Sequence, residues 1–278
     1  MTLNINNNDR LSGVYTGLSR RWLKVRKSLW HHILRTTRQH SRAVFLVGSG
    51  RSGTDIMAHC LSRSMDVKLI NETDTLAFKN WRLKDLNTVK QAVTSSGAPV
   101  VLLKPIVETM RVKELLDTFH ASRALFLIRD YRDAINSMAS FFGEKHVRAV
   151  TSWIESDFRR FPLVPGDLRS LVGRIWEEDC SVESACGIYW LVYNSSYLFL
   201  DLRMDERIRI MNYEMLVMEP ENTLRGVCDY LGLQYNNDMI ADVYATSVNR
   251  RPAPSLQPVL QHYCEETWNH LIKICGST

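Results

Sequence analysis

The stretch AVFLVGSGRSGTDIMAHCLSRS, residues 43–64, contains the pattern around which the rest of the chain is organised. Its first five residues are apolar and predict a buried strand. Three glycines follow within residues 48–53, and apolar residues then recur at helical spacing. A strand, a glycine-rich loop and a helix in this order can cradle a phosphate, because the loop amides and the positive end of the helix both favour an anion. The sequence therefore predicts that this stretch binds a phosphate compound.

The loop departs from the usual P-loop at two positions. The pattern G-x-x-x-x-G-K-[ST] needs a Lys that reaches the outer phosphates and then a hydroxyl that binds Mg²⁺. Gly48 and Gly53 have the required spacing, but Thr54 and Asp55 stand at the next two positions. Both residues that carry NTPase chemistry are absent, which argues against a kinase. The cation in the loop is Arg51 instead.

An arginine followed by Ser, Gly and Thr in such a loop resembles the 5′-phosphosulfate loop of the sulfotransferases that use 3′-phosphoadenosine 5′-phosphosulfate (PAPS). The form with Arg resembles the carbohydrate-type and bacterial branches of that family, which has a P-loop-like fold. The resemblance implies PAPS as co-substrate, 3′-phosphoadenosine 5′-phosphate (PAP) as product, and no metal. It also implies that the sulfated phosphate is bound by Gly50, Arg51, Ser52, Gly53, Thr54 and Asp55.

The rest of the chain predicts a single α/β domain with a central parallel sheet. Apolar strands alternate with helical segments, so helices should flank the sheet and ligands should bind at the carboxyl ends of the strands. Residues 141–179, broken by Pro162 and Pro165, predict helical insertions or a loop that covers the substrate. The expected strands are residues 43–47, 67–70, 99–103, 124–128 and 207–211, and the expected helices include residues 81–94, 111–120, 183–202, 220–231 and 256–275.

The stretch FLIRDYRDAINSM, residues 126–138, carries a second phosphate signature. Arg129 ends a strand and Ser137 follows on a helix, so a charged fork and a hydroxyl can hold one phosphate from two sides. This closely resembles the family motif that binds the 3′-phosphate of PAPS. Arg251, in a basic loop, sits where the family often places a further cation over that phosphate. A third match, residues 211–233, resembles the family's late strand–turn–helix segment and only corroborates the first two.

Sulfuryl transfer needs a cation at the leaving phosphate oxygen and a base for the acceptor hydroxyl. Arg51 is our candidate for the cation. The histidine base of the family's phenol and steroid branch is absent, because Ile106 stands two residues after the strand-end Lys104. The carbohydrate-type branch has a Glu just after the second strand, and Glu72 matches it. The resemblance thus implies Glu72 as base and Lys104 near the sulfate, with Glu108 as the reserve base.

Asp55 departs from the family pattern, which usually has Ser or Thr at this position. A carboxylate beside a bound phosphate weakens binding unless it points away or meets a cation. We expect Asp55 to cap the helix, to pair with Arg51 or Lys104, or to indicate weaker PAPS use or altered chemistry.

The positive charge of the chain is concentrated at its start. Of the net charge of +5, residues 1–42 hold +8 and the remainder −3. Residues 17–40 predict a basic amphipathic helix, which packs on the body or a second subunit, or lies on an anionic membrane surface. No aromatic-rich groove or recognition motif points to nucleic acid. The apolar stripe of this helix consists of Leu18, Trp22, Val25, Leu29 and Ile33.

These features divide the chain into a basic extension, residues 1–42, and a sulfotransferase domain, residues 43–278. The chain shows no secretory signal, no apolar run long enough to span a membrane and no C-x-x-C pairs, which together predict a cytoplasmic protein. If the extension binds lipid, we expect the protein at the membrane surface. A homo-oligomer is compatible with this division. The histidines show no metal-binding spacing, and we expect His146 at the surface.

The sequence predicts transfer of a sulfuryl group from PAPS to a hydroxyl of a carbohydrate, lipid or other metabolite. The acceptor is thus a small molecule, a glycan or a lipid. One alternative is a degenerate nucleotide-binding or scaffold protein of the same fold, and a P-loop kinase is the other. Tight PAP binding without transfer would indicate the scaffold, and Mg²⁺-dependent use of ATP would indicate the kinase.

Overall fold

The central strand, β1 (Arg42–Gly48), leads directly into the glycine-rich loop. The computed structural model describes residues 25–33, 41–245 and 252–276. Within them a five-stranded sheet has the order β2-β5-β1-β6-β7, and all neighbouring strands are parallel, as predicted. The remaining strands of this sheet are β2 (Val67–Ile70), β5 (Val100–Leu103), β6 (Arg123–Ile128) and β7 (Ile208–Asn212).

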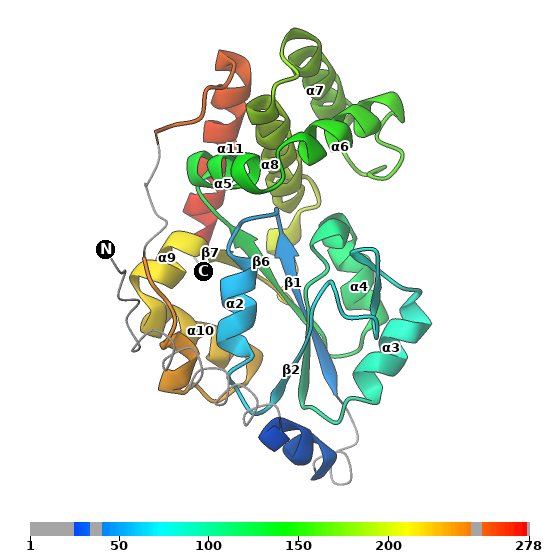
Figure 1. Ribbon diagram of the computed structural model, residues 1–278, viewed down its shortest axis with the longest axis vertical. Helices are drawn as coiled ribbons and strands as arrows, with labels where there is room; N and C mark the ends of the chain where they lie inside the picture. Colours follow the sequence, from blue (N-terminus) through cyan, green and yellow to red (C-terminus); the bar gives the residue numbers. More distant parts are fainter. Residues whose placement is uncertain (1–24, 34–40, 246–251, 277–278) are drawn as a thin grey trace, which may run out of the picture.

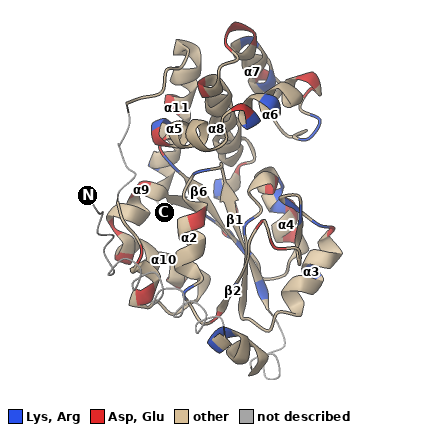
Figure 2. Ribbon diagram, viewed as in Figure 1, with Lys and Arg blue, Asp and Glu red and all other residues tan. Residues whose placement is uncertain are grey.

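Both faces of the sheet are covered by helices, which explains why β1 is apolar without alternation. Phe45 and Val47 pack in the cluster formed with α3 (Leu86–Thr94) and α4 (Val112–Thr118). Val44 and Leu46 face the other way, into the cluster formed with α2 and α10. Figure 1 shows these helix pairs on opposite sides of the sheet, and Figure 2 shows the strands mainly without charge. The two helices of the second cluster are α2 (Thr54–Leu61) and α10 (Pro220–Leu231).

A group of helices covers the end of the sheet at which β1 and β6 terminate (Figure 1). They share one apolar cluster, and α8 (Val182–Phe199) runs through it with Trp190 and Tyr193 fully buried. The insertion predicted at residues 141–179 is helical and contributes two of these helices. The other members of this helical cap are α5 (Tyr131–Phe141), α6 (Glu144–Glu155), α7 (Gly166–Glu178) and α11 (Pro258–Cys275).

The prediction of a helix at residues 81–94 is wrong for the first part of this range. A two-stranded hairpin, β3 (Phe78–Lys79) and β4 (Arg82–Leu83), occupies this part of the chain. The helix starts only at Leu86, because the carboxylate of Asp85 accepts a hydrogen bond from the Thr88 amide at 2.9 Å and caps it. An Asp N-cap of this kind marks a helix start.

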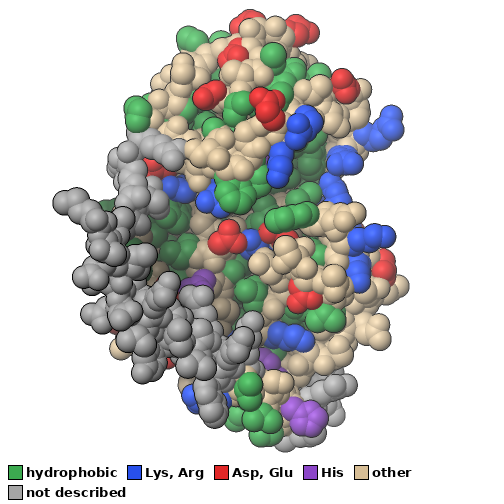
Figure 3. Space-filling view, in the orientation of Figure 1, with side chains coloured by type: hydrophobic (Ala, Val, Ile, Leu, Met, Phe, Trp, Pro, Cys, Tyr) green, Lys and Arg blue, Asp and Glu red, His purple; other side chains and the backbone are tan. Residues whose placement is uncertain are grey.

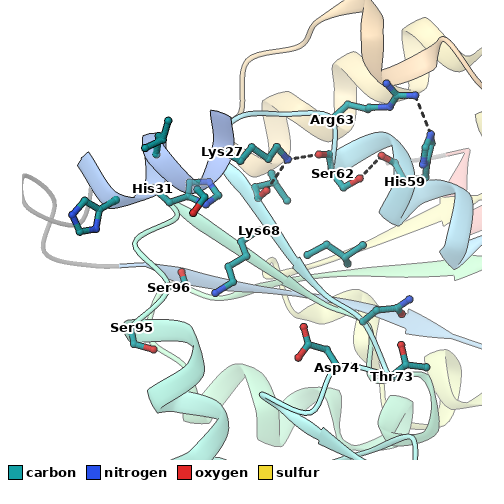
Figure 4. A pocket seen from close by; sticks show the side chains of 16 residues that line it. Lys27, His31, His59, Ser62, Arg63, Lys68, Thr73, Asp74, Ser95 and Ser96 are labelled. Carbon is teal, nitrogen blue, oxygen red and sulfur yellow. Dashed lines mark hydrogen bonds between the residues drawn. The ribbon is translucent and has the colours of Figure 1, made fainter. Parts of the chain in front are cut away.

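Residues 25–33 form a helix that contacts the body through its polar side. Lys27 donates hydrogen bonds to the carbonyl oxygens of Ser62 and Val67, as Figure 4 shows for Ser62, and His31 Nε2 lies 2.8 Å from the Met65 oxygen. Val25 and Leu29 are 54% and 62% exposed. The expectation that this stripe packs on the body is therefore wrong for these two residues.

Two members of the stripe, Leu18 and Trp22, lie outside the described residues, as does the rest of residues 1–24 and 34–40. Within the described ranges no helix combines the length and the apolar character needed to cross a membrane. The division of the chain at residue 42 stays a prediction.

Short segments complete the described chain. α9 (Tyr213–Met218) follows β7 directly. Three 3₁₀ segments, η1 (Ile106–Arg111), η2 (Leu202–Met204) and η3 (Asn237–Ile240), connect larger elements. α10 ends at Leu231, as predicted, and is capped by Gly232, whose left-handed φ of 57° is a common C-cap geometry.

Candidate active site

Two glycines of the loop are required by close packing. Gly48 has a φ of +134°, and a Cβ there would lie 2.3 Å from the Leu127 carbonyl oxygen. Gly53 has a φ of +93°, and a Cβ there would lie 2.3 Å from the ring of Tyr213. The Gly48 amide also donates to Thr109 Oγ1 at 3.0 Å. Strand β6, η1 and α9 thus fix the loop from three sides.

A cavity of about 470 Å³ opens beside this loop. It brings together the two phosphate motifs, which lie about 75 residues apart in the sequence, at the carboxyl ends of the neighbouring strands β1 and β6. We call it the nucleotide cavity. The predicted residues that line it are Arg51, Gly53, Thr54, Asp55, Arg129 and Ser137.

Two further predicted binding residues, Gly50 and Ser52, do not line the nucleotide cavity. Ser52 is buried, and its hydroxyl donates to the Ser49 carbonyl at 2.7 Å, so it shapes the loop. A Cβ on Gly50 would lie 3.7 Å from the Phe142 ring and 3.9 Å from the Tyr189 ring, which places Gly50 under the helical cap. Arg251 lies outside the described residues.

The two arginines of the nucleotide cavity are held by aromatic rings. Arg51 donates from Nε to Ser137 Oγ at 3.0 Å, and its guanidinium lies 4.7 Å from the centre of the Phe141 ring. Arg129 is buried, lies 4.4 Å from the centre of the Tyr213 ring and donates to the Arg51 carbonyl at 3.3 Å. Planar contacts of this kind fix guanidinium groups in position. The cavity therefore presents two oriented positive charges.

Lys104 connects the loop to the turn after β2. Its Nζ lies 2.5 Å from Asp55 Oδ1 and 3.0 Å from Glu72 Oε2. Burial disfavours the ammonium, but the two carboxylates outweigh it and raise the pKa of Lys104. Among the roles expected for Asp55, the structure shows the pairing with Lys104. A lysine held between two carboxylates stays protonated at neutral pH.

Glu72 is the better placed of the two candidate bases. It is buried, and this burial raises its pKa, although the attraction of Lys104 opposes the rise. Glu108 has both oxygens engaged, with Arg82 at 3.2 Å and Arg111 at 3.1 Å. A raised pKa makes a carboxylate a stronger proton acceptor near neutral pH. Glu72 has this raised pKa and also lines a cavity.

The cavity lined by Glu72 has a volume of about 460 Å³ and also contains residues of the β3–β4 hairpin. We call it the hairpin cavity. Asp55 lines the nucleotide cavity and Glu72 lines the hairpin cavity. Because Lys104 contacts both carboxylates, it lies where the two cavities approach each other.

A cavity of about 1000 Å³ contains none of the predicted phosphate-binding residues. It runs along the edge strand β2, from Lys27 and His31 of the N-terminal helix to Thr73 and Asp74 beyond β2 (Figure 4). Its lining is mainly basic on the side of the helix. Its size alone does not make it the site of the chemistry.

His146 is buried, so the expectation of a surface position is wrong. Its ring stacks between Phe142, at 4.8 Å, and Tyr189, at 4.3 Å. Burial lowers the pKa of His146 to about 4, which keeps the ring neutral. The apolar helical cap created this environment, and no local sequence signal predicted it.

Six residues that line the nucleotide cavity were not predicted from the sequence, and two of them, Tyr213 and Phe141, hold its arginines. Tyr213 contacts both Gly53 and Arg129, and Phe141 covers Arg51. Tyr213 belongs to the third matching segment, which was a signal for its position but not for its role. No sequence pattern indicated a role for Phe141. In the described ranges no three His, Cys, Asp or Glu side chains are grouped so that they could hold a metal ion.

The parallel α/β sheet brings the glycine-rich loop, with a basic residue in place of the P-loop lysine, next to a second predicted phosphate motif on the adjacent strand. The Sulfotransferase domain family matches residues 41–251. The chain belongs to this family, whose activity is sulfuryl transfer.

The fold is similar to that of a solved sulfotransferase domain. The sulfotransferase domain from the curacin biosynthetic pathway aligns with a TM-score of 0.52 at 15% identity, over 82% of this chain and 98% of that one. A sulfotransferase from Alicyclobacillus acidocaldarius gives 0.45 at 14% identity, over 84% and 94%. Mouse sulfotransferase SULT7A1 complexed with PAP gives 0.42 at 14% identity, over 84% and 85%. Comparison with curated protein sequences gave no match.

Proposed function

We propose that the protein transfers a sulfuryl group from PAPS to a hydroxyl of a carbohydrate, lipid or other metabolite. The observation that carries this proposal is that Arg51, Arg129 and Ser137, from two separate phosphate motifs, line one cavity. A compound with phosphates at both ends, such as PAPS, needs two cationic positions of this kind. A nucleoside triphosphate, with one run of phosphates, does not.

The residues present fit the two ends of PAPS. Arg51 and Thr54 are suited to the sulfated 5′-phosphate, because the loop and the start of α2 meet there. Arg129 and Ser137 are suited to the 3′-phosphate. The hydroxyl of Ser49, in the same loop, is buried without a hydrogen-bond partner within the described residues. Such a group is expected to be satisfied by a ligand or by water.

The transfer is an in-line exchange of one S–O bond for another. The bond between sulfur and the 5′-phosphate oxygen breaks, a bond to the acceptor oxygen forms, and PAP leaves. Arg51 stabilises the charge that develops on the leaving oxygen. Glu72 takes the proton of the acceptor hydroxyl, and Lys104 orients the carboxylate and adds positive charge where the cavities meet.

Calorimetric titration with PAP, and with ATP in the absence and in the presence of Mg²⁺, tests the donor. We expect tight binding of PAP alone, and loss of it in Arg129→Ala. Arg132→Ala is the matched control, because Arg132 lies in the same motif but pairs with Asp130 at 2.6 Å and does not line the nucleotide cavity. Absence of PAP binding, or preference for ATP with Mg²⁺, would refute the proposal and favour the kinase.

A second candidate is a nucleotide-binding protein of the same fold without transferase activity. The pairing of Lys104 with Asp55 favours it, because this carboxylate offsets positive charge at the place where sulfate would bind. This candidate predicts PAP binding without PAP release from PAPS in the presence of any acceptor. Release of PAP that requires an added acceptor would exclude it.

We also propose a role for residues 1–42 as a basic extension that brings the domain to an anionic membrane surface. The exposure of Val25 and Leu29 on the helix of residues 25–33 supports this proposal. An amphiphilic acceptor would then be presented to a domain in the cytoplasm. Contact with a second subunit is the competing use of the same stripe.

A further inference from the structure

Trp81 occupies a backbone conformation that its side chain disfavours. Lys79 pairs with Arg82 in the β3–β4 hairpin, so Asn80 and Trp81 form a two-residue loop. Their φ angles are +51° and +66°. Two-residue loops with positive φ at both positions strongly prefer Asn-Gly, because glycine has no Cβ to clash. Asn80 follows this rule and Trp81 breaks it.

Trp81 is also largely exposed to solvent. Its side chain and backbone together retain 56% of their accessible surface. A large apolar ring gains little stability at such a position, and a smaller residue would remove the backbone strain. Neither packing nor the turn therefore explains a tryptophan here. Strain and exposure in one residue point to binding.

The position of Trp81 indicates which class of ligand its ring would bind. The residue lines the hairpin cavity together with Glu72, the proposed base. Two of the residues that line this cavity, Lys79 and Lys84, are basic, and Figure 3 shows several Lys and Arg side chains along the right-hand edge of the molecule. The other residues that line the cavity are mostly polar: Thr73, Thr75 and Asn80, with the ring of Phe78.

This lining distinguishes between acceptor classes. A lipid tail or a steroid needs an enclosed apolar pocket, which an exposed ring in an open cavity bordered by Thr, Asn and Lys side chains does not provide. A sugar ring has one flat C–H face, which stacks on an aromatic ring, and hydroxyls at its edge, which hydrogen-bond to polar side chains. The hairpin cavity offers both partners.

We propose that Trp81 is the stacking platform for a hexopyranoside acceptor and holds one of its hydroxyls toward Glu72. This inference rests on the proposed sulfotransferase function and names its substrate class. The hairpin then fixes acceptor specificity, while the loop and the β6–α5 motif bind the donor. Trp81 contacts the acceptor and makes no contact with PAPS.

Two substitutions separate binding from structure. Trp81→Gly removes the ring and gives the turn the residue it prefers, so we expect a thermal midpoint equal to or above that of the wild type. Trp81→Tyr keeps an aromatic face and the strained turn. Both variants should bind PAP as the wild type does, because Trp81 does not line the nucleotide cavity.

Saturation-transfer NMR with PAP present measures acceptor contact directly. The probes are methyl β-D-glucopyranoside, methyl β-D-galactopyranoside, methyl N-acetyl-β-D-glucosaminide and methyl β-D-glucuronide, with 4-nitrophenol as an aromatic comparison. We expect transfer to the protons of one sugar face in the wild type and in Trp81→Tyr. In Trp81→Gly we expect the dissociation constant of that glycoside to rise about tenfold or more.

Three results would overturn the inference: equal glycoside signals in the wild type and Trp81→Gly, no signal from any glycoside, or Trp81-dependent binding of 4-nitrophenol alone. The PAP titration on the same samples separates this failure from that of the donor proposal. Loss of PAP binding in the wild type would refute the sulfotransferase function, whereas normal PAP binding without glycoside contact would refute only the role of Trp81.

Discussion

Lys104 and Glu72 form a buried ion pair, with 3.0 Å between Nζ and Oε2 and each side chain less than a tenth exposed. Such a pair is costly to desolvate, so its presence at the edge of two cavities points to chemistry more than to stability. The lysine favours the ionised form of this carboxylate and also contacts Asp55, which lines the nucleotide cavity. The first two predictions concern this pair and Asp55, which also contacts Lys104.

Glu72→Gln should lower kcat by about 100-fold or more, because general-base catalysis contributes 10²–10⁴-fold. The affinity for PAP should stay nearly unchanged. Burial raises the pKa of Glu72, and only the ionised form accepts a proton, so the wild-type rate should fall as the pH falls through this raised pKa. Initial rates across pH, with PAP titrations, measure both effects.

Glu108→Gln is the control for the substitution of Glu72. Glu108 is buried like Glu72 but both of its oxygens contact arginines. We expect this variant to lose stability and to keep the pH profile of the wild type. If Glu108→Gln lost the acidic limb and Glu72→Gln kept it, the roles assigned to the two residues would be reversed.

Asp55→Ser should tighten PAP binding two- to fivefold, because it removes a carboxylate from the nucleotide cavity. The effect should be small, because the Asp55 side chain is 70% exposed and solvent screens its charge. The pKa of Lys104 should fall, since the hydrogen bond to Asp55 is the main contribution that raises it. Calorimetry at two salt concentrations measures the affinity. Weaker binding would show that Asp55 supports the loop.

The sequence predicted the sheet and half of the residues that line the nucleotide cavity because both depend on local patterns. Apolar runs bounded by glycine or polar residues gave the strands, and parallel topology then placed their carboxyl ends together. Arg129 and Ser137 could be paired with the loop because neighbouring strands bring their ends to one edge. The family resemblance supplied the roles.

What the sequence could not predict depends on contacts between distant segments. The hairpin at residues 78–83 was missed because Trp81 replaces the glycine that marks such a turn. The burial of His146 results from α8 and the rest of the helical cap, far along the chain. The pairing of Asp55 with Lys104 was one of several expected contacts, and only the structure selected it.

Gly53→Ala should abolish PAP binding and destabilise the fold by about 1–3 kcal/mol, because the new Cβ would overlap the Tyr213 ring and the φ of +93° disfavours it. Gly173→Ala in α7 is the matched control. A Cβ there meets nothing within 4 Å, so alanine should stabilise the helix by about 0.5–1 kcal/mol. Urea unfolding and PAP titration measure both variants; equal stability changes would refute the overlap.

Glu214 should make the stability depend on pH. Burial raises its pKa to about 7, and its Oε1 accepts a hydrogen bond from the Asp130 amide at 3.1 Å. The folded state therefore binds this proton more tightly than the unfolded state. The stabilisation is complete below about pH 4.5 and is lost as the pH rises to about 7.

Glu214→Gln should remove this loss. Relative to the variant, the wild type should lose up to about 3 kcal/mol of unfolding free energy between pH 4.5 and 7.5. Urea unfolding of both proteins at several pH values measures the difference. A constant difference across this range would show that Glu214 ionises normally in the folded protein.

The exposed stripe of the N-terminal helix should bind anionic membranes. Leu29→Ser should weaken binding to phosphatidylserine vesicles about tenfold, because the Leu29 side chain is 62% exposed and would insert into the interface. Leu163→Ser, at a residue 59% exposed on the helical cap side, should leave binding unchanged. Flotation with vesicles, at low and high salt, measures the effect. Equal binding by both variants would refute the membrane role and favour a second subunit as the partner of the stripe. Light scattering would then detect a dimer of the wild type that Leu29→Ser does not form.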